Sequence, residues 1–145
     1  MNFIETSKAL DEADIFNVEK VLGFELPSEF KEHYLEYNGG YPESDRYKWK
    51  DGSTTTINTF ASIKYDGFSH LEKVYKNLAI EELYLPEKIL PFATDDGGNL
   101  FCISAREKDY GCIYYCNNDH YNVNHKEECL TLVDKSFKGF IANLV

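Results

Sequence analysis

Apolar side chains repeat at helical spacing in four parts of the chain. These parts are residues 11–23, 27–37, 69–78 and 136–144. In the first, an apolar stripe runs from Ile15 to Leu22, and Gly23 is placed to end the helix. Pro27 fits the first turn of the second helix, and Ser69 is a candidate N-cap for the third. The pattern therefore predicts four helices.

The middle of the chain is dominated by strand-like runs. β-Branched and aromatic residues fill 54–63, a short extended piece spans 88–90, and further runs occupy 100–104, 112–117 and 130–133. Turn residues at 108–111 predict a hairpin, whereas the polar stretch 41–53 predicts a loop. Helices at both ends with strands between them predict an α+β fold. No repeat or linker interrupts the pattern, so we expect a single domain over residues 1–145.

The charge is strongly negative and unevenly distributed. The net charge is −10, from 25 acidic and 15 basic residues, and residues 1–45 alone hold eleven acidic and three basic side chains. Phosphate binding needs clustered Lys and Arg, so direct binding to nucleic acid or to an anionic membrane is disfavoured. A basic protein partner is favoured, because complementary charge steers association. The simpler interpretation is that the charge serves only solubility.

Cysteine content and the first residues bear on the compartment. Four cysteines in 145 residues are too few for a disulfide scaffold. Residues 1–10 contain Glu5 and Lys8 and lack the apolar core of a signal peptide. No apolar run approaches the length of a membrane span. We therefore expect a cytoplasmic protein with free thiols.

The segment Asp95-Asp96-Gly97-Gly98-Asn99 is the first candidate for chemistry. Paired carboxylates can serve acid–base catalysis or bind a hard cation, and adjacent glycines can cradle a phosphate. A calcium loop needs oxygen ligands at alternate positions, and a phosphate loop needs a following helix. An apolar, strand-like run follows instead. We therefore predict a tight turn, which favours the same residue types.

Cys112, Cys116, His120 and His125 superficially resemble a zinc pattern. Zinc fingers separate the cysteine pair from the histidine pair by about twelve residues, and that separation is missing here. Cys112 and Cys116 also fall on one face of an alternating strand, where cysteine acts as a small apolar residue. His33 lies within a predicted helix, away from any recognisable nucleophile. We expect no metal, no cofactor and no catalytic residues.

Several separated motifs together resemble one family. The motifs are Val18-Glu19-x-x-Leu22-Gly23, Leu26-Pro27-x-x-Phe30-Lys31, Asn38-Gly39-Gly40, Leu90-Pro91-Phe92-Ala93, Asp96-Gly97-Gly98-Asn99-x-Phe101-Cys102-Ile103, Gly111-x-Ile113-Tyr114-Tyr115 and Ser136-Phe137-x-x-Phe140-Ile141-x-x-Leu144. Their order and spacing, from Asp11 to Leu144, resemble the SUKH superfamily. That superfamily includes fungal cell-wall assembly regulators and bacterial immunity proteins of polymorphic toxin systems. Cys116 stands where the family tends to have an aromatic residue.

The resemblance implies both a fold and a function. It implies an α+β domain with a central, bent, mainly antiparallel sheet flanked by N-terminal and C-terminal helices. It also implies an immunity protein, not an enzyme, that binds and neutralises a cognate toxin domain by stoichiometric occlusion. The net charge favours a basic toxin such as a nuclease. The alternative is a regulatory scaffold for endogenous partners, as in the fungal relatives, and an enzyme is a third possibility.

The family's matching residues are mostly fold-forming, so its partner-binding residues do not carry over. From charge and position we expect the partner surface in the acidic N-terminal region, with a second candidate at the acidic turn. The candidates are Glu29, Glu32, Glu36, Tyr41, Glu43, Asp45, Asp95, Asp96 and Asp119. We expect a monomer or weak dimer.

Overall fold

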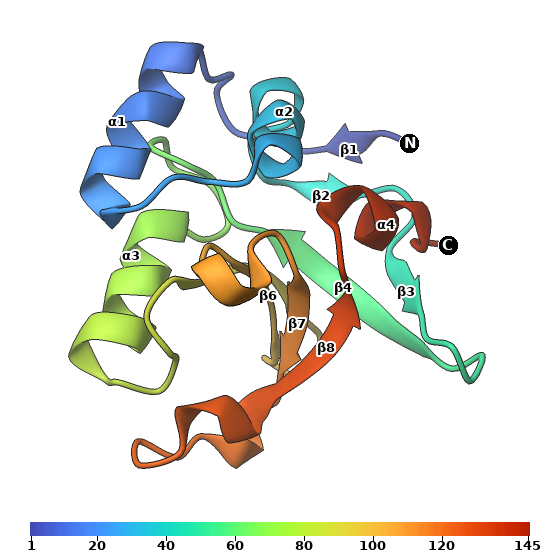
Figure 1. Cartoon of the computed structure of the whole chain (residues 1–145). Helices are drawn as coiled ribbons and strands as arrows, with labels where there is room; N and C mark the ends of the chain where they lie inside the picture. Colours follow the sequence, from blue (N-terminus) through green and yellow to red (C-terminus); the bar gives the residue numbers. More distant parts are fainter.

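The computed structural model describes residues 1–145 and is an α+β fold with a curled antiparallel sheet (Figure 1). The elements, in chain order, are β1 (Phe3–Ile4), α1 (Glu12–Leu22), α2 (Ser28–Glu36), β2 (Tyr41–Pro42), β3 (Arg46–Lys48), β4 (Thr54–Phe60), α3 (Leu71–Tyr75), η1 (Lys76–Glu81), β5 (Ile89–Asp95), β6 (Leu100–Ser104), η2 (Glu107–Asp109), β7 (Ile113–Cys116), η3 (Asn118–His120), η4 (Lys126–Cys129), β8 (Leu130–Asp134) and α4 (Phe137–Ala142). The predicted fold class is confirmed.

The main sheet has six strands in the order β3-β4-β5-β6-β7-β8, and every neighbouring pair is antiparallel. Strands β5 and β6 lie at its centre and are almost wholly buried. Register shifts between Pro91 and Ala93, and between Ile113 and Tyr114, bend the sheet locally. The curl brings β3 near β8, and the Tyr47 hydroxyl donates to the Val133 carbonyl at 3.1 Å.

Helices cover the sheet from both sides. Phe137 and Phe140 of α4 pack on Phe92 of β5 at ring-centroid distances of 5.5 and 5.6 Å. Phe30 of α2 joins the same aromatic cluster, 5.3 Å from Phe137. Figure 1 shows α3 to one side of the strands and α4 to the other. The aromatic stripes predicted for the second and last helices therefore form much of the core.

The predicted helix ends are confirmed at α1. The Asp11 side chain accepts from the Asp14 backbone N–H at 2.8 Å, and the Asp14 side chain accepts from the Asp11 N–H at 3.1 Å. Gly23 adopts a φ of 86° at the other end. The Ser69 N-cap prediction is wrong, because α3 begins at Leu71 after His70, and no side chain caps it. The helix also becomes a π-helix, η1, from Lys76 onward.

Two short strands lie where the sequence predicted a loop, and β1 was not predicted. In β3 a single buried Tyr47 lies between exposed Arg46 and Lys48, so three residues carry too little alternation to be recognised. Strands β1 and β2 pair only with each other, as a separate two-stranded ribbon. The other strand predictions hold, although β5 extends beyond the predicted 88–90 piece as far as Asp95.

Candidate functional site

Three of the predicted acidic residues lie along one hollow. Glu29, Glu32 and Glu36 of α2 face α4 across a groove of about 320 Å³, which His33 and Phe137 also line. Because these residues are spaced at three and four positions along α2, one face of the helix carries all three carboxylates. Glu29 has a structural contact as well, since its carboxylate accepts from the Lys138 backbone N–H at 3.3 Å.

His33 forms the inner wall of this groove. Its ring packs edge-on against Phe3 at 4.6 Å and Phe137 at 5.1 Å, and its Nε2 atom is buried with no hydrogen-bond partner. Burial lowers the pKa of His33 from 6.5 to about 4. The imidazole is therefore neutral at pH 7, and it does not offset the negative charge of the rim.

Four more candidates line a second, larger hollow. Tyr41, Glu43, Asp45 and Asp96 border an open depression of about 720 Å³, together with Ile4. Strand β2 positions Tyr41, and the turn after β5 positions Asp96. Asp96 lies more than fifty positions after Asp45 in the sequence, so only the fold brings it beside the N-terminal acids.

Tyr37 lies near a carboxylate of each hollow. The Tyr37 hydroxyl donates to Asn2 Oδ1 at 3.1 Å, and the backbone of Asn2 in turn accepts from the Glu43 N–H at 3.0 Å. The pKa of Tyr37 is raised by desolvation and by the negative charges of Glu36 and Glu43. Carboxylates from both hollows therefore lie near one ring. We call the set Glu32, Glu36, Glu43, Asp45 and Asp96 the acidic face.

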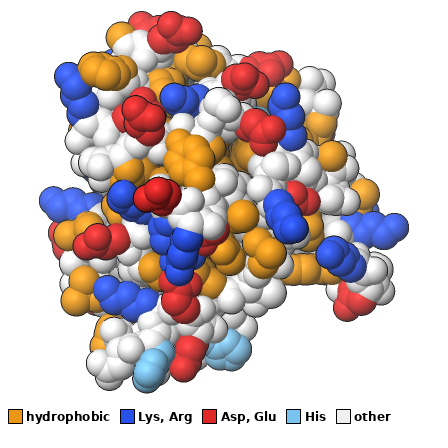
Figure 2. Space-filling model, viewed as in Figure 1, with side chains coloured by type: hydrophobic (Ala, Val, Ile, Leu, Met, Phe, Trp, Pro, Cys, Tyr) orange, Lys and Arg blue, Asp and Glu red, His pale blue; other side chains and the backbone are white.

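Exposed apolar side chains accompany the acidic face. Ile4 and Phe68 are each 50% exposed, and the Phe68 ring packs edge-on against Tyr41 at 4.6 Å. Aromatic anchors ringed by polar groups are typical of protein interfaces. Sequence reasoning missed both residues, since β1 was not predicted and Phe68 lies in a turn region without a distinguishing pattern. Figure 2 shows acidic side chains over the part of the molecule that α1 and α2 form.

Asp95 and Asp119 have different environments from the rest. Asp95 is buried, and its carboxylate accepts from the backbone N–H groups of Gly97 and Asn99 at 2.9 and 2.8 Å and from the Tyr115 hydroxyl. The predicted tight turn is confirmed, and the Asp95 carboxylate stabilises it. Asp119 is exposed in η3, next to the same turn, because the Asn118 backbone donates to the Asn99 side chain at 3.0 Å.

The cysteines are not arranged around a metal site. Cys116 is buried, with its Sγ 2.9 Å from that of Cys129, whereas His120 and His125 are exposed. Cys112 is half-buried and not in the core, because it lies before the start of β7 and not within the strand. No group of three or more His, Cys, Asp or Glu side chains has a metal-binding arrangement.

The most tightly bonded ionic cluster lies elsewhere and stabilises a loop. The Asp109 carboxylate accepts from Arg106 Nη2 at 2.5 Å, Tyr114 at 2.6 Å and Ser104 at 2.5 Å. These bonds hold the pKa of Asp109 well below its usual range. Both oxygens of this carboxylate are therefore occupied by hydrogen bonds that hold the connection between β6 and β7.

Comparison with known proteins gives one family match and one similar protein. The model of the SMI1/KNR4 family (SUKH-1) matches residues 9–143. A SPbeta prophage-derived uncharacterized protein, YokK, of Bacillus subtilis (strain 168) is 26% identical over 160 aligned positions, which cover 98% of this chain and 76% of that protein. None of the helices combines the length and apolarity needed to cross a bilayer.

Proposed function

Because the chain belongs to the SMI1/KNR4 family (SUKH-1), we propose that it is an immunity protein that binds a cognate toxin domain and neutralises it. Neutralisation is by stoichiometric occlusion: the bound protein covers the active site or the substrate groove of the toxin. We place the complex in the cytoplasm, a reducing compartment in which the four cysteines of this chain stay free thiols.

The observation that carries the proposal is the acidic face beside exposed apolar residues. Five carboxylates from α2, from residues near β2 and from the turn after β5 border two hollows. Ile4 and Phe68 supply apolar contact area in the same region. Nuclease toxins need positive surfaces to hold nucleic acid, so an acidic face can occupy such a surface in place of phosphate.

The mechanism we propose needs no catalysis. The carboxylates of Asp95 and Asp109 each accept several hydrogen bonds from within the fold. Burial raises the pKa of the Cys102 thiol far above its usual value, so that this cysteine stays protonated. The acidic face, in contrast, consists of exposed groups suited to contact a partner.

Co-expression with the product of the adjacent reading frame tests the function. We expect that product to be toxic alone, to be harmless in the presence of this protein, and to co-purify with it at fixed stoichiometry. A harmless neighbour that does not bind would contradict the immunity function and would favour a regulatory scaffold with endogenous partners.

Charge reversal tests the acidic face. In a variant with Glu32, Glu36, Glu43 and Asp45 changed to Lys, we expect toxin association to slow at least about tenfold at low salt, because steering by complementary charge is lost. The association rate should also depend less on ionic strength. Stopped-flow or surface-plasmon measurements with purified toxin give both quantities.

A matched variant controls for net charge. Glu81, Glu82, Glu87 and Glu107 are exposed, lie outside the acidic face and form no ion pairs, so changing them to Lys alters the net charge equally. This control should associate at nearly the original rate. Equal slowing in both variants would show that total charge, and not the acidic face, governs binding.

A further inference from the structure

Strand β8 leaves one edge of the main sheet open. It pairs with β7 alone, and none of the backbone hydrogen bonds made outside helices and strands involves residues 130–134. The Cys129 carbonyl accepts from the Asn117 N–H at 3.0 Å, and Thr131 pairs with Tyr115. Since antiparallel pairing alternates along a strand, the backbone groups of Leu130 and Leu132 point away from β7. These N–H and C=O groups are available to another strand.

The opposite edge of the sheet is covered. The Arg46 N–H donates to the Val145 carbonyl at 3.2 Å, and the Val145 N–H donates back at 2.7 Å. The Lys48 N–H donates to the Asn143 carbonyl at 3.1 Å. Residues 143–145 therefore protect β3 in the way that native sheets usually protect an edge, whereas β8 has no such cover.

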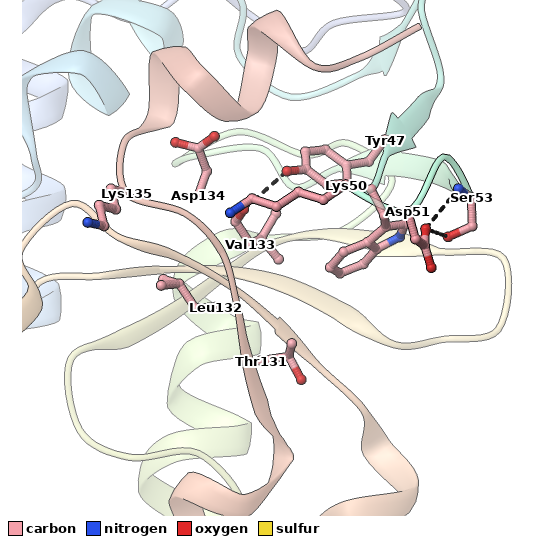
Figure 3. Close-up of a pocket in the computed structure, with 10 residues that line it drawn as sticks. Tyr47, Lys50, Asp51, Ser53, Thr131, Leu132, Val133, Asp134 and Lys135 are labelled. Atoms are coloured by element: carbon pink, nitrogen blue, oxygen red, sulfur yellow. Dashed lines mark hydrogen bonds between the residues drawn. The ribbon is translucent and has the colours of Figure 1, made fainter.

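A groove runs along the open edge of β8 (Figure 3). Its volume is about 650 Å³, and its two walls are residues 131–135 and the tip of the β3–β4 hairpin. The hydrogen bond from the Tyr47 hydroxyl to the Val133 carbonyl joins the two walls. Leu132 is 49% exposed, and Trp49 provides an aromatic surface on the other wall. The groove thus combines an unpaired strand edge with apolar contacts.

The groove holds two lysines and two aspartates, and only the lysines are left without a partner inside the fold. Lys50 and Lys135 border it from opposite walls and form no ion pair. The two acids of the groove are bonded within the fold: Asp51 accepts from Ser53 N–H at 2.9 Å, and Asp134 accepts from Ser136 N–H at 2.9 Å. In Figure 3 the Lys50 side chain extends across the groove towards β8.

We propose that this groove binds an extended, acidic segment of a partner protein, which adds to the sheet as a strand beside β8. Main-chain hydrogen bonds to Leu130 and Leu132 hold the segment, as in other cases of strand addition. Acidic side chains of the segment pair with Lys50 and Lys135. The site is separate from the acidic face and selects the opposite charge, so it is a second interaction surface.

Trp49 makes the groove directly observable, because it is the only tryptophan of the chain. Its indole lies edge-on to Tyr115 at 5.7 Å and donates to the Thr55 hydroxyl at 2.8 Å. The probe is a synthetic peptide of about six residues, the usual strand length, that alternates glutamate with valine. We expect the Trp49 fluorescence to change and saturate on titration, with affinity falling as salt is added.

Control peptides distinguish strand addition from non-specific binding. A peptide with lysine in place of glutamate should produce no saturable change, because it would repel Lys50 and Lys135. The glutamate peptide methylated at alternate backbone nitrogens should bind more weakly, since it cannot complete the ladder. Equal binding of all three peptides, or no fluorescence change with the first, would overturn the proposal.

Two substitutions at one position test the backbone contact. The Leu132 N–H faces away from β7, so Leu132→Pro removes a free donor without breaking the existing ladder. Leu132→Ala removes the same side chain and keeps the donor. We expect Leu132→Pro to bind the glutamate peptide about fivefold more weakly than Leu132→Ala, the factor for one hydrogen bond. Equal affinities would contradict strand addition.

The double variant Lys50→Glu, Lys135→Glu tests the charge contribution. We expect its affinity for the glutamate peptide to be at least about tenfold lower. The quadruple reversal of the acidic face should leave peptide affinity unchanged, so the two surfaces can fail independently. Size-exclusion chromatography tests whether a second copy of the chain occupies the edge instead. A dimer that Leu132→Pro dissociates would show this and would overturn the proposal of an acidic partner segment.

Discussion

At the scale of the residue, His33 couples stability to pH. The imidazole is held neutral by burial among aromatic rings, with a pKa of about 4 against about 6.5 when exposed. As pH falls below 6.5, the unfolded chain binds a proton that the folded chain does not, so stability falls until about pH 4. The loss from this residue is about 3 kcal/mol. Urea unfolding at a series of pH values should show it, and His33→Phe should remove that part of the slope.

Exposed histidines supply the control for this measurement. His120 has an exposed side chain, and His120→Gln should keep the original pH dependence. If His33→Phe has the same slope as the unmodified protein between pH 7 and 4, the loss of stability comes from other groups, and His33 is not the sensor.

Residue types predicted the candidate site only in part. Charge counting found the acidic face, because an excess of carboxylates in residues 1–45 is visible without a structure. It also included Asp95, whose carboxylate is bonded within its turn. The pattern cannot separate a free carboxylate from a bonded one, since both occur in runs of Asp, Gly and Asn. Ile4 and Phe68 were missed because isolated apolar residues have no periodicity.

At the scale of the element, the β1–β2 ribbon depends on one close approach. Gly40 has a φ of 92°, and a Cβ on it would lie 2.4 Å from the Ile4 carbonyl oxygen. Gly40→Ala should therefore displace β1 and reduce the free energy of unfolding by about 2 kcal/mol or more, as measured by chemical denaturation. Because β1 carries Ile4, binding of the proposed toxin should weaken as well.

Gly52 provides a matched comparison for Gly40. It has nearly the same φ, 89°, but a Cβ there would meet no atom within 4 Å. Gly52→Ala should lower the free energy of unfolding by only about 1 kcal/mol, the strain of a positive φ at a non-glycine residue. Equal losses in the two variants would mean that the close contact with β1 contributes nothing.

Long, strongly periodic elements were predictable and short ones were not. The α1 helix was recognised with both ends, since its apolar stripe and its terminal glycine agree. Strands of two or three residues, such as β1 and β3, are specified by partners distant in sequence. The pairing of Tyr47 with Leu144 and with Val133 illustrates this, because no local pattern encodes it.

At the scale of the whole molecule, order should decrease from the centre of the sheet outward. Every residue of β6 is buried, and six of the seven residues of β5 are. We expect the backbone amides of these two strands to exchange most slowly with solvent, and those of Leu130 and Leu132 to exchange much faster. Hydrogen exchange followed by nuclear magnetic resonance resolves the individual amides. Slowest exchange in α1 or α3 would contradict this order.

The cover that residues 143–145 give to β3 has a consequence for the timing of synthesis. Arg46 leaves the ribosome about a hundred residues before Val145, an interval on the order of 5–20 s at ordinary rates of translation. During that interval the first strand of the sheet has no outer neighbour. The outer edge of the sheet is therefore covered only after residues 143–145 emerge, so a nascent chain that ends before them leaves β3 open to pairing with other chains.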